Sequence, residues 1–162
     1  MRALLILCLG LFLALGAGCS RFMEYDGPEV TRVEVHKSER FLVLYHHEEI
    51  LEAMPIELGF APEGHKAQEG DGRTPEGEYV IDRRNPDSEY YLSIGISYPN
   101  ADDIAAAEEA GVSPGGDIFI HGTPREFRGD EDWTAGCIAV TNREMRRIYA
   151  MVEDGTPIII HP

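Results

Sequence analysis

Two side chains in the C-terminal third of the chain could together perform nucleophilic chemistry. Cys137 follows Gly136 in the segment TAGCIAV, and His121 ends the apolar segment DIFIH. A cysteine nucleophile needs a base that takes its proton and backbone N–H groups that bind the oxyanion formed on attack at a carbonyl. His121 could be the base, and a carbonyl could approach the peptide groups around Gly136 because glycine has no side chain. The alternative is a buried, inert thiol and a structural histidine.

The other two cysteines lie in an N-terminal region that has the pattern of an export signal. Residues 1–18 carry one charge, Arg2, followed by an apolar run over 3–15 and by small residues. This run is shorter than the ~20 residues of a membrane-spanning helix. We therefore expect Cys8 to leave with a cleaved signal, and an uncleaved anchor helix is the alternative.

Cys19 follows Leu-Gly-Ala-Gly, a stretch that resembles a bacterial lipobox with its leucine one position further from the cysteine than usual. Lipidation of Cys19 and plain cleavage both remain open. We expect an exported protein of the periplasm or cell envelope, which lipidation would tether to a membrane without spanning it. Disulfides persist in such compartments, so a lone thiol there is either buried or retained for reactivity.

Composition limits the classes of partner. The net charge is −15 over 162 residues, which argues against nucleic acid or anionic lipid as a ligand. Hydrophobic residues at 43% and charged residues at 27% are ordinary for a globular domain. The length favours one domain, which we place at residues 30–162, after a tether over 19–29.

Short segments rich in Val, Ile, Tyr and Phe predict a mainly β domain. The predicted strands are 31–37, 40–47, 54–60, 77–84, 90–98, 117–122, 136–140 and 156–162. Two helices interrupt them, one between Asn100 and Gly111 and one from a Thr141/Glu144 capping box to Gly155. The second helix follows the cysteine segment directly, so packed structure should hold the thiol. Long loops over 61–77 and 122–136 are candidates for function, and the latter joins the two reactive residues.

Three blocks of sequence resemble the L,D-transpeptidase (YkuD-type) family. IHGT and TAGCIAV resemble its catalytic block, EGDGRTPEGEYVI over 69–81 resembles an upstream block, and GTPIIIHP resembles its last strand. The resemblance covers about residues 30–162. It implies a mainly β, sandwich-like catalytic domain with one or two short helices.

The resemblance also implies roles for particular residues. Cys137 would be the nucleophile and His121 the general base, with the backbone carbonyl of Gly122 orienting the imidazole. The N–H groups of Gly136 and Cys137 would form the oxyanion hole, and Thr134 would shape the site around the thiolate. We expect the imidazole to lower the apparent pKa of the thiol.

The implied reaction is acyl transfer on peptidoglycan peptide stems, with no metal or other cofactor. The cysteine would attack meso-diaminopimelate in a tetrapeptide stem, release D-alanine and form a thioester. An amine would resolve the thioester to a 3→3 cross-link. The alternatives are a hydrolase that trims a stem or releases a protein cross-link, and a catalytically weak wall-binding module. The oligomeric state is not predicted.

One position departs from the family pattern and raises the question of substrate recognition. Many members carry Arg two residues after the cysteine, where this chain has Ala139. Other arginines could hold a stem carboxylate through bidentate hydrogen bonds. The candidates are Arg73, Arg125, Arg128 and Arg143. Trp133 is either a loop anchor or a wall of the substrate site.

The histidines give no convincing metal motif. The run HHEE over 46–49 would alternate between two faces of a strand, so its four side chains could not converge on one ion. His121 and Cys137 lack an obvious third and fourth zinc ligand. We expect His36, His65 and His161 to be surface or loop residues.

Overall fold

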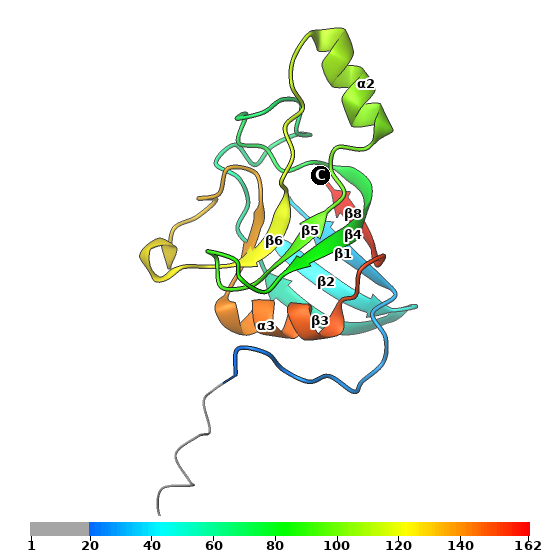
Figure 1. The fold of residues 1–162 in the computed structure, drawn as a ribbon, viewed down its shortest axis with the longest axis vertical. Coiled ribbons are helices and arrows are strands. Elements are labelled where there is room, and N and C mark those ends of the chain that lie inside the picture. The colour runs from blue at the N-terminus through cyan, green and yellow to red at the C-terminus, as the bar shows by residue number, and fades with distance from the viewer. Residues whose placement is uncertain (1–19) are drawn as a thin grey trace, which may run out of the picture.

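The computed structural model of the protein describes residues 20–162. The predicted signal over 1–18, including Cys8, and the lipidation candidate Cys19 lie outside the described residues. Eight strands form one strongly curved sheet in the order β3-β2-β1-β8-β4-β5-β6-β7 (Figure 1). The elements are β1 (Arg32–His36), β2 (Phe41–His46), β3 (Glu49–Pro55), β4 (Gly77–Asn85), β5 (Ser93–Ile96), α2 (Ala101–Ala110), β6 (Phe119–Gly122), the short 3₁₀ helix η1 (Arg125–Phe127), β7 (Ile138–Val140), α3 (Asn142–Met151) and β8 (Pro157–His161).

The two ends of the sheet approach each other, so the sheet nearly closes. Strands β1 and β8 pair in parallel, as do β6 and β7, and the other neighbours are antiparallel. After β3 the chain crosses to the opposite edge, where the N–H and C=O of Glu57 exchange hydrogen bonds of 2.8 Å with those of Ala139 on β7. The mainly β class predicted from the sequence is confirmed.

One predicted strand was wrong. The chain over 56–60 makes isolated bridges only, and the strand before it runs from Glu49 to Pro55. The reason is a tight turn at His47 (φ +51°) and Glu48, which pairs β2 with β3 as a hairpin. Residues 46–49 therefore span a turn and do not lie along one strand as we expected.

Both helices begin at their predicted caps. The side chain of Asn100 accepts hydrogen bonds from the first turn of α2, and the carboxylate of Asp103 accepts one from the backbone N–H of Asn100. Thr141 and Glu144 form the same reciprocal pair at the start of α3. The second helix ends at Met151 and not at Gly155, because the chain turns extended at Val152 to enter β8.

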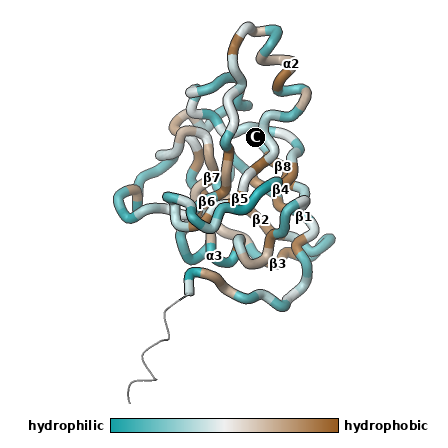
Figure 2. The backbone as a smooth tube through the Cα atoms, viewed as in Figure 1, coloured by the Kyte–Doolittle hydropathy of each residue, from teal (hydrophilic) through white to brown (hydrophobic). Residues whose placement is uncertain are grey.

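The core fills the inside of the curved sheet and is closed at one end by α3. Met145, Ile148 and Val152 of this region are fully buried, and α3 packs against β5 and β6. Apolar residues follow the strands while the loops are mostly hydrophilic (Figure 2). Helix α2 projects from the opposite end of the domain (Figure 1). The site segments β6 and β7 are therefore anchored on packed structure.

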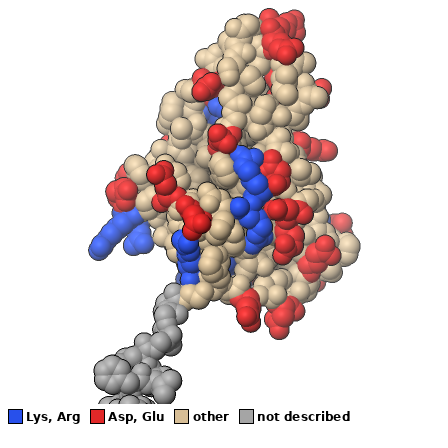
Figure 3. All heavy atoms as spheres, viewed as in Figure 1, with Lys and Arg blue, Asp and Glu red and all other residues tan. Residues whose placement is uncertain are grey.

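Residues 20–29 run along the domain surface and contact it. Tyr25 packs against the core, and the ring of Phe22 lies 6.1 Å from that of Tyr149 on α3. Acidic side chains are spread over much of the face seen in Figure 3, around a central stripe of basic ones. Among residues 20–162, no helix has the length and apolar character needed to cross a membrane.

Candidate active site

The parallel pairing of β6 and β7 brings the two reactive side chains together. His121 is in register with Ala139, so Cys137, two residues earlier, lies beside Phe119 on the same face of the strands. Cys137 and His121 line one cavity of about 290 Å³. Its other lining residues are Asn85, Asp87, Ser88, Glu89, Tyr90, Ser93, Asp117 and Phe119. A molecule in this cavity can contact thiol and imidazole at once.

His121 is buried, and a hydrogen bond fixes the tautomer of its imidazole. Its Nδ1 lies 2.8 Å from the backbone oxygen of Gly122. A carbonyl oxygen only accepts hydrogen bonds, so Nδ1 carries the proton and Nε2 keeps a free lone pair. The imidazole is 3% exposed, and this burial lowers its pKa although the Gly122 carbonyl acts in the opposite direction. The ring stacks on Tyr90 at 4.5 Å and meets the edge of Trp133 at 5.5 Å.

Cys137 is a half-buried free thiol. Its Sγ–H donates to the backbone oxygen of Asp117 at 3.5 Å. Burial raises the pKa of the thiol, an effect that the nearby Asp117 carboxylate reinforces and a backbone contact from Phe119 opposes. Burial therefore favours the uncharged form of both the Cys137 thiol and the His121 imidazole. This differs from the low thiol pKa that we predicted, because burial disfavours the charged form of both groups.

Thr134 organises the turn that carries the cysteine. Its hydroxyl donates to the backbone oxygen of Cys137 at 2.7 Å and accepts the N–H of Gly136 at 3.2 Å. The N–H of Gly136 is thus engaged inside the turn, whereas we predicted that it faces an oxyanion. The closed turn fixes the direction of the Cys137 peptide, and Thr134 acts as a positioning residue.

Gly136 is required by its conformation and by its surroundings. Its φ is +129°, and a Cβ here would lie 2.6 Å from the backbone oxygen of Arg73. The loop over 61–76 therefore presses its backbone against the cysteine turn. Lys37, which is 2% exposed, holds that loop by donating from Nζ to the backbone oxygens of Gly64 and Thr74 and to Glu76.

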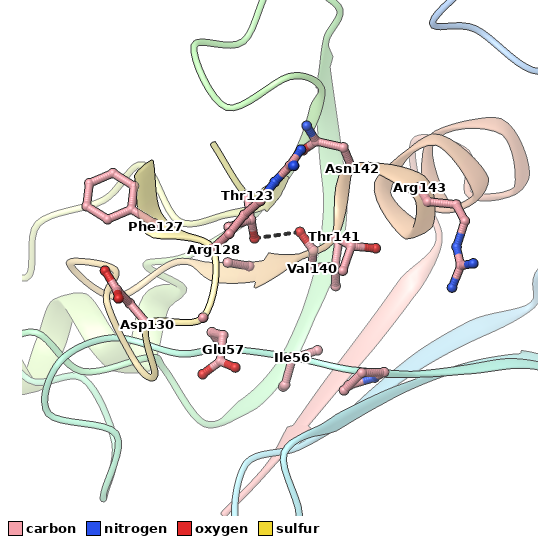
Figure 4. A pocket seen from close by; sticks show the side chains of 13 residues that line it. Ile56, Glu57, Thr123, Phe127, Arg128, Asp130, Val140, Thr141, Asn142 and Arg143 are labelled. Carbon is pink, nitrogen blue, oxygen red and sulfur yellow. Dashed lines mark hydrogen bonds between the residues drawn. The ribbon is translucent and has the colours of Figure 1, made fainter. Parts of the chain in front are cut away.

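A second cavity of about 400 Å³ lies beside the end of β7 and the start of α3 (Figure 4). Thr123 and Ala139 line it, each two residues beyond a residue of the thiol cavity. Its remaining lining residues are Pro55, Ile56, Glu57, Phe127, Arg128, Gly129, Asp130, Val140, Thr141, Asn142 and Arg143. Ala139, at the position that carries Arg in many family members, forms part of the wall of this cavity and is itself fully buried.

The structure divides the predicted substrate-binding residues into two groups. Arg128 and Arg143 come together around the second cavity. Within residues 20–162, Arg73 and Arg125 line neither cavity, and both are exposed. Trp133 stands between the cavities, because its ring stacks on Phe127 at 4.3 Å and also meets the ring of His121.

Two residues of the site had no signal in the sequence. Tyr90 stacks on the imidazole of His121. Asp117, with φ +54°, turns its carbonyl toward the thiol. Both lie in irregular segments beside strands, where side-chain direction depends on the tertiary path of the chain and not on periodicity.

Comparison with known proteins agrees with this architecture. The sequence model of the L,D-transpeptidase catalytic domain matches residues 30–160. The chain belongs to the L,D-transpeptidase catalytic-domain family. YafK of Escherichia coli (strain K12), which carries the provisional name L,D-transpeptidase, is 32% identical over 126 residues, or 74% of this chain and 46% of YafK.

Solved structures of this family have the same fold. The helical cell shape determining protein Pgp2 of Campylobacter jejuni is 27% identical, with a TM-score of 0.66 over 89% of this chain and 52% of Pgp2. Bd1075 of Bdellovibrio bacteriovorus is 22% identical, with a TM-score of 0.61 over 86% of this chain and 50% of Bd1075. An L,D-transpeptidase of Mycobacterium smegmatis is 17% identical, with a TM-score of 0.56 over 82% of this chain and 59% of the smegmatis chain. The chain spans about half the length of YafK and Pgp2.

Proposed function

We propose that the protein is a cysteine-dependent acyltransferase that acts on peptidoglycan peptide stems, with an amine as the acceptor. The observation that carries this proposal is the His121 imidazole, whose Nδ1–H is fixed on the Gly122 carbonyl while its ring shares a cavity with Cys137. The family acts on peptidoglycan, which supplies the substrate class. Pgp2 is a cell-shape-determining protein by name, and we extend that role in cell shape to this chain.

The first half-reaction follows from the neutral pair. Nε2 of His121 accepts the Sγ proton as Sγ attacks the carbonyl on the L-centre of meso-diaminopimelate, so that an S–C bond forms. The carbonyl oxygen becomes an oxyanion, for which the peptide N–H of Cys137 is the nearest candidate donor. The imidazolium then gives its proton to the departing amine, the C–N bond breaks, and D-alanine leaves a thioester on Cys137.

The second half-reaction regenerates the thiol. His121 accepts a proton from the acceptor amine as its nitrogen attacks the thioester carbonyl, and the thiolate leaves and takes the proton back. The product is a 3→3 cross-link. Water in place of the amine would give a tripeptide carboxylic acid, which is the hydrolase alternative. The family's thiol chemistry thus needs only residues that this chain has.

Charge around the two cavities supports separate recognition of amine and carboxylate. Asp87, Glu89 and Asp117 line the thiol cavity, and such a rim attracts an ammonium group of the stem. Arg128 and Arg143 line the second cavity and suit a stem carboxylate, because guanidinium groups bind carboxylates bidentately. We propose that these two arginines replace the family Arg that is Ala139 here.

Product analysis by mass spectrometry tests the proposal. The chain from Ser20 onward, which contains the whole sheet and core, is incubated with disaccharide-tetrapeptide beside Cys137→Ala and His121→Gln. We expect a 3→3 dimer and free D-alanine with the unaltered chain only. A tripeptide without dimer that depends on Cys137 would transfer the assignment to a hydrolase. Equal product in all three samples would contradict thiol catalysis, and no product in any of them would favour a hydrolase of a protein cross-link or a wall-binding module.

The proposed location is the cell envelope, where peptidoglycan lies. Export would use residues 1–18, and lipidation at Cys19 would hold the domain at a membrane. Mass analysis of the mature chain from cells distinguishes a lipidated Cys19 from plain cleavage. An unprocessed N-terminus beginning at Met1 would contradict both cleavage and lipidation and favour the uncleaved anchor.

A further inference from the structure

Three potential metal ligands meet on the sheet face opposite the core, away from the thiol. Glu34 and His36 alternate with the buried Val33 and Val35 on β1, and His161 lies on β8. The parallel pairing of these strands puts His36 directly beside His161. In residues 20–162, these three form the one group of at least three histidine, cysteine or carboxylate ligands whose ligand atoms all lie within 4.8 Å of one another.

The distances within this group fit a metal ion better than hydrogen bonds. Oε2 of Glu34 lies 3.5 Å from Nε2 of His36 and 3.5 Å from Nε2 of His161, which is long for hydrogen bonds. Zinc ligands bind at about 2.0–2.1 Å, so neighbouring ligand atoms of a tetrahedral site are about 3.3–3.4 Å apart. Among the described residues, Nε2 of His161 is buried and has no hydrogen-bond partner.

Neighbouring side chains orient each ligand. Nε of Arg32 donates to Oε1 of Glu34 at 2.7 Å, which leaves Oε2 free on the side of the histidines. Phe41 stacks on one side of His36 at 4.6 Å, and His161 stacks on the other at 4.7 Å. A hydrogen bond to the ligating carboxylate, as Arg32 makes to Glu34, is typical of metal sites.

The charges that face the group allow a dication. Arg32 is a neighbouring cation, and its guanidinium lies over the ring of Tyr45 at 3.8 Å. Glu39, in the turn between β1 and β2, adds a second carboxylate near both imidazoles. Glu34 is in register with Val43 on the neighbouring strand β2, and Ile159 of β8 is in register with Glu78 on β4. Carboxylates therefore outnumber the one permanent cation around the two imidazoles.

We propose that Glu34, His36 and His161 form a binding site for a divalent transition-metal ion of the zinc class. Two imidazole nitrogens and one carboxylate oxygen suit zinc, with water in the fourth position. The ion would join the first strand of the domain to its last strand. The site is separate from the cysteine chemistry and does not depend on the proposed function.

Calorimetric titration of the chain from Ser20 onward with Zn²⁺ tests this site. We expect one ion per chain and a higher melting temperature at excess zinc, because the ion binds only the folded chain. His36→Gln and His161→Gln should each weaken binding by more than the roughly 10–100-fold that loss of a supporting contact costs. His47→Gln is the matched control, because the ring of His47 also lies against a neighbouring histidine, His46, at 4.5 Å between ring centroids, and it should leave binding unchanged.

Cobalt spectroscopy and a thiol variant separate this site from other sources of binding. Co²⁺ should give the intense visible bands of a four-coordinate ion in the unaltered chain and in Cys137→Ser, and lose them in the two ligand variants. Binding that survives both His36→Gln and His161→Gln would overturn the proposal. So would binding that is lost only in Cys137→Ser, or the absence of any zinc-dependent rise in melting temperature.

Discussion

Replacement of Thr134 by valine should damage both the fold and the chemistry, because its hydroxyl closes the cysteine turn. Thr134 is 4% exposed, and its Oγ1 serves the N–H of Gly136 and the C=O of Cys137. Valine keeps the shape but leaves both backbone groups without this partner. A buried polar group without a partner costs about 1–3 kcal/mol. We expect Thr134→Val to lower the free energy of unfolding by about 2–4 kcal/mol, since the turn borders a solvent-open cavity.

The matched variant is Thr134→Ser, which keeps the hydroxyl and loses one methyl group. It should cost about 1 kcal/mol and keep most of the activity. Urea unfolding with both variants gives the free energies. Cys137-dependent release of D-alanine gives the activity, which we expect to fall about 100-fold in Thr134→Val, as a misplaced nucleophile does. The loss should fall on kcat more than on KM, because the turn positions the nucleophile and does not bind the substrate.

Two results would refute this reasoning. Equal unfolding free energies for the valine and serine variants would mean that the hydroxyl does not stabilise the turn. Full activity of a stable Thr134→Val chain would mean that the turn does not position Cys137. A fall in activity that tracks KM alone would assign Thr134 to substrate binding.

Three further predictions concern the base, the loop and its anchor. Burial lowers the pKa of His121, so the neutral imidazole persists to lower pH. The acid limb of kcat/KM should therefore lie below the ordinary imidazole pKa of about 6.5. An acid limb above that value in a pH–rate profile would contradict this prediction. Burial alone would raise the pKa of Asp71, but backbone donors and Lys66 lower it to about 2. The ionised carboxylate should contribute about 2–3 kcal/mol to the free energy of unfolding above about pH 4, and this contribution should be lost as the pH falls toward 2. In pH-dependent unfolding, Asp71→Asn should abolish this part of the pH dependence. Lys37→Met should lower the free energy of unfolding by about 3 kcal/mol, because Glu76 and two backbone carbonyls lose their buried cation. A loss below about 1 kcal/mol in urea unfolding would show that the loop over 61–76 does not need Lys37.

The local elements could be predicted from the sequence because their signals are local. Alternating apolar residues gave most strands, and the Thr141/Glu144 and Asn100/Asp103 caps set both helix starts. Strand β3 was misplaced because the turn at His47 depends on a backbone conformation that periodicity does not reveal.

The candidate site was predictable only in part. His121 and Cys137 could be chosen from residue types, spacing and resemblance, since the chemistry restricts which side chains can serve. Their protonation could not, because it depends on burial by segments distant in sequence. Likewise, the resemblance led to the N–H of Gly136 as an oxyanion donor, whereas the structure engages it with Thr134.

The sequence by itself determined the strand and helix pattern, the family blocks and the two reactive residues. Only the tertiary structure decided which distant groups meet. Parallel pairing of β6 with β7 places the thiol beside its base, and parallel pairing of β1 with β8 places His36 beside His161. The physical reason is that strand order and register arise from closing one sheet around one core, which no local pattern along the chain specifies.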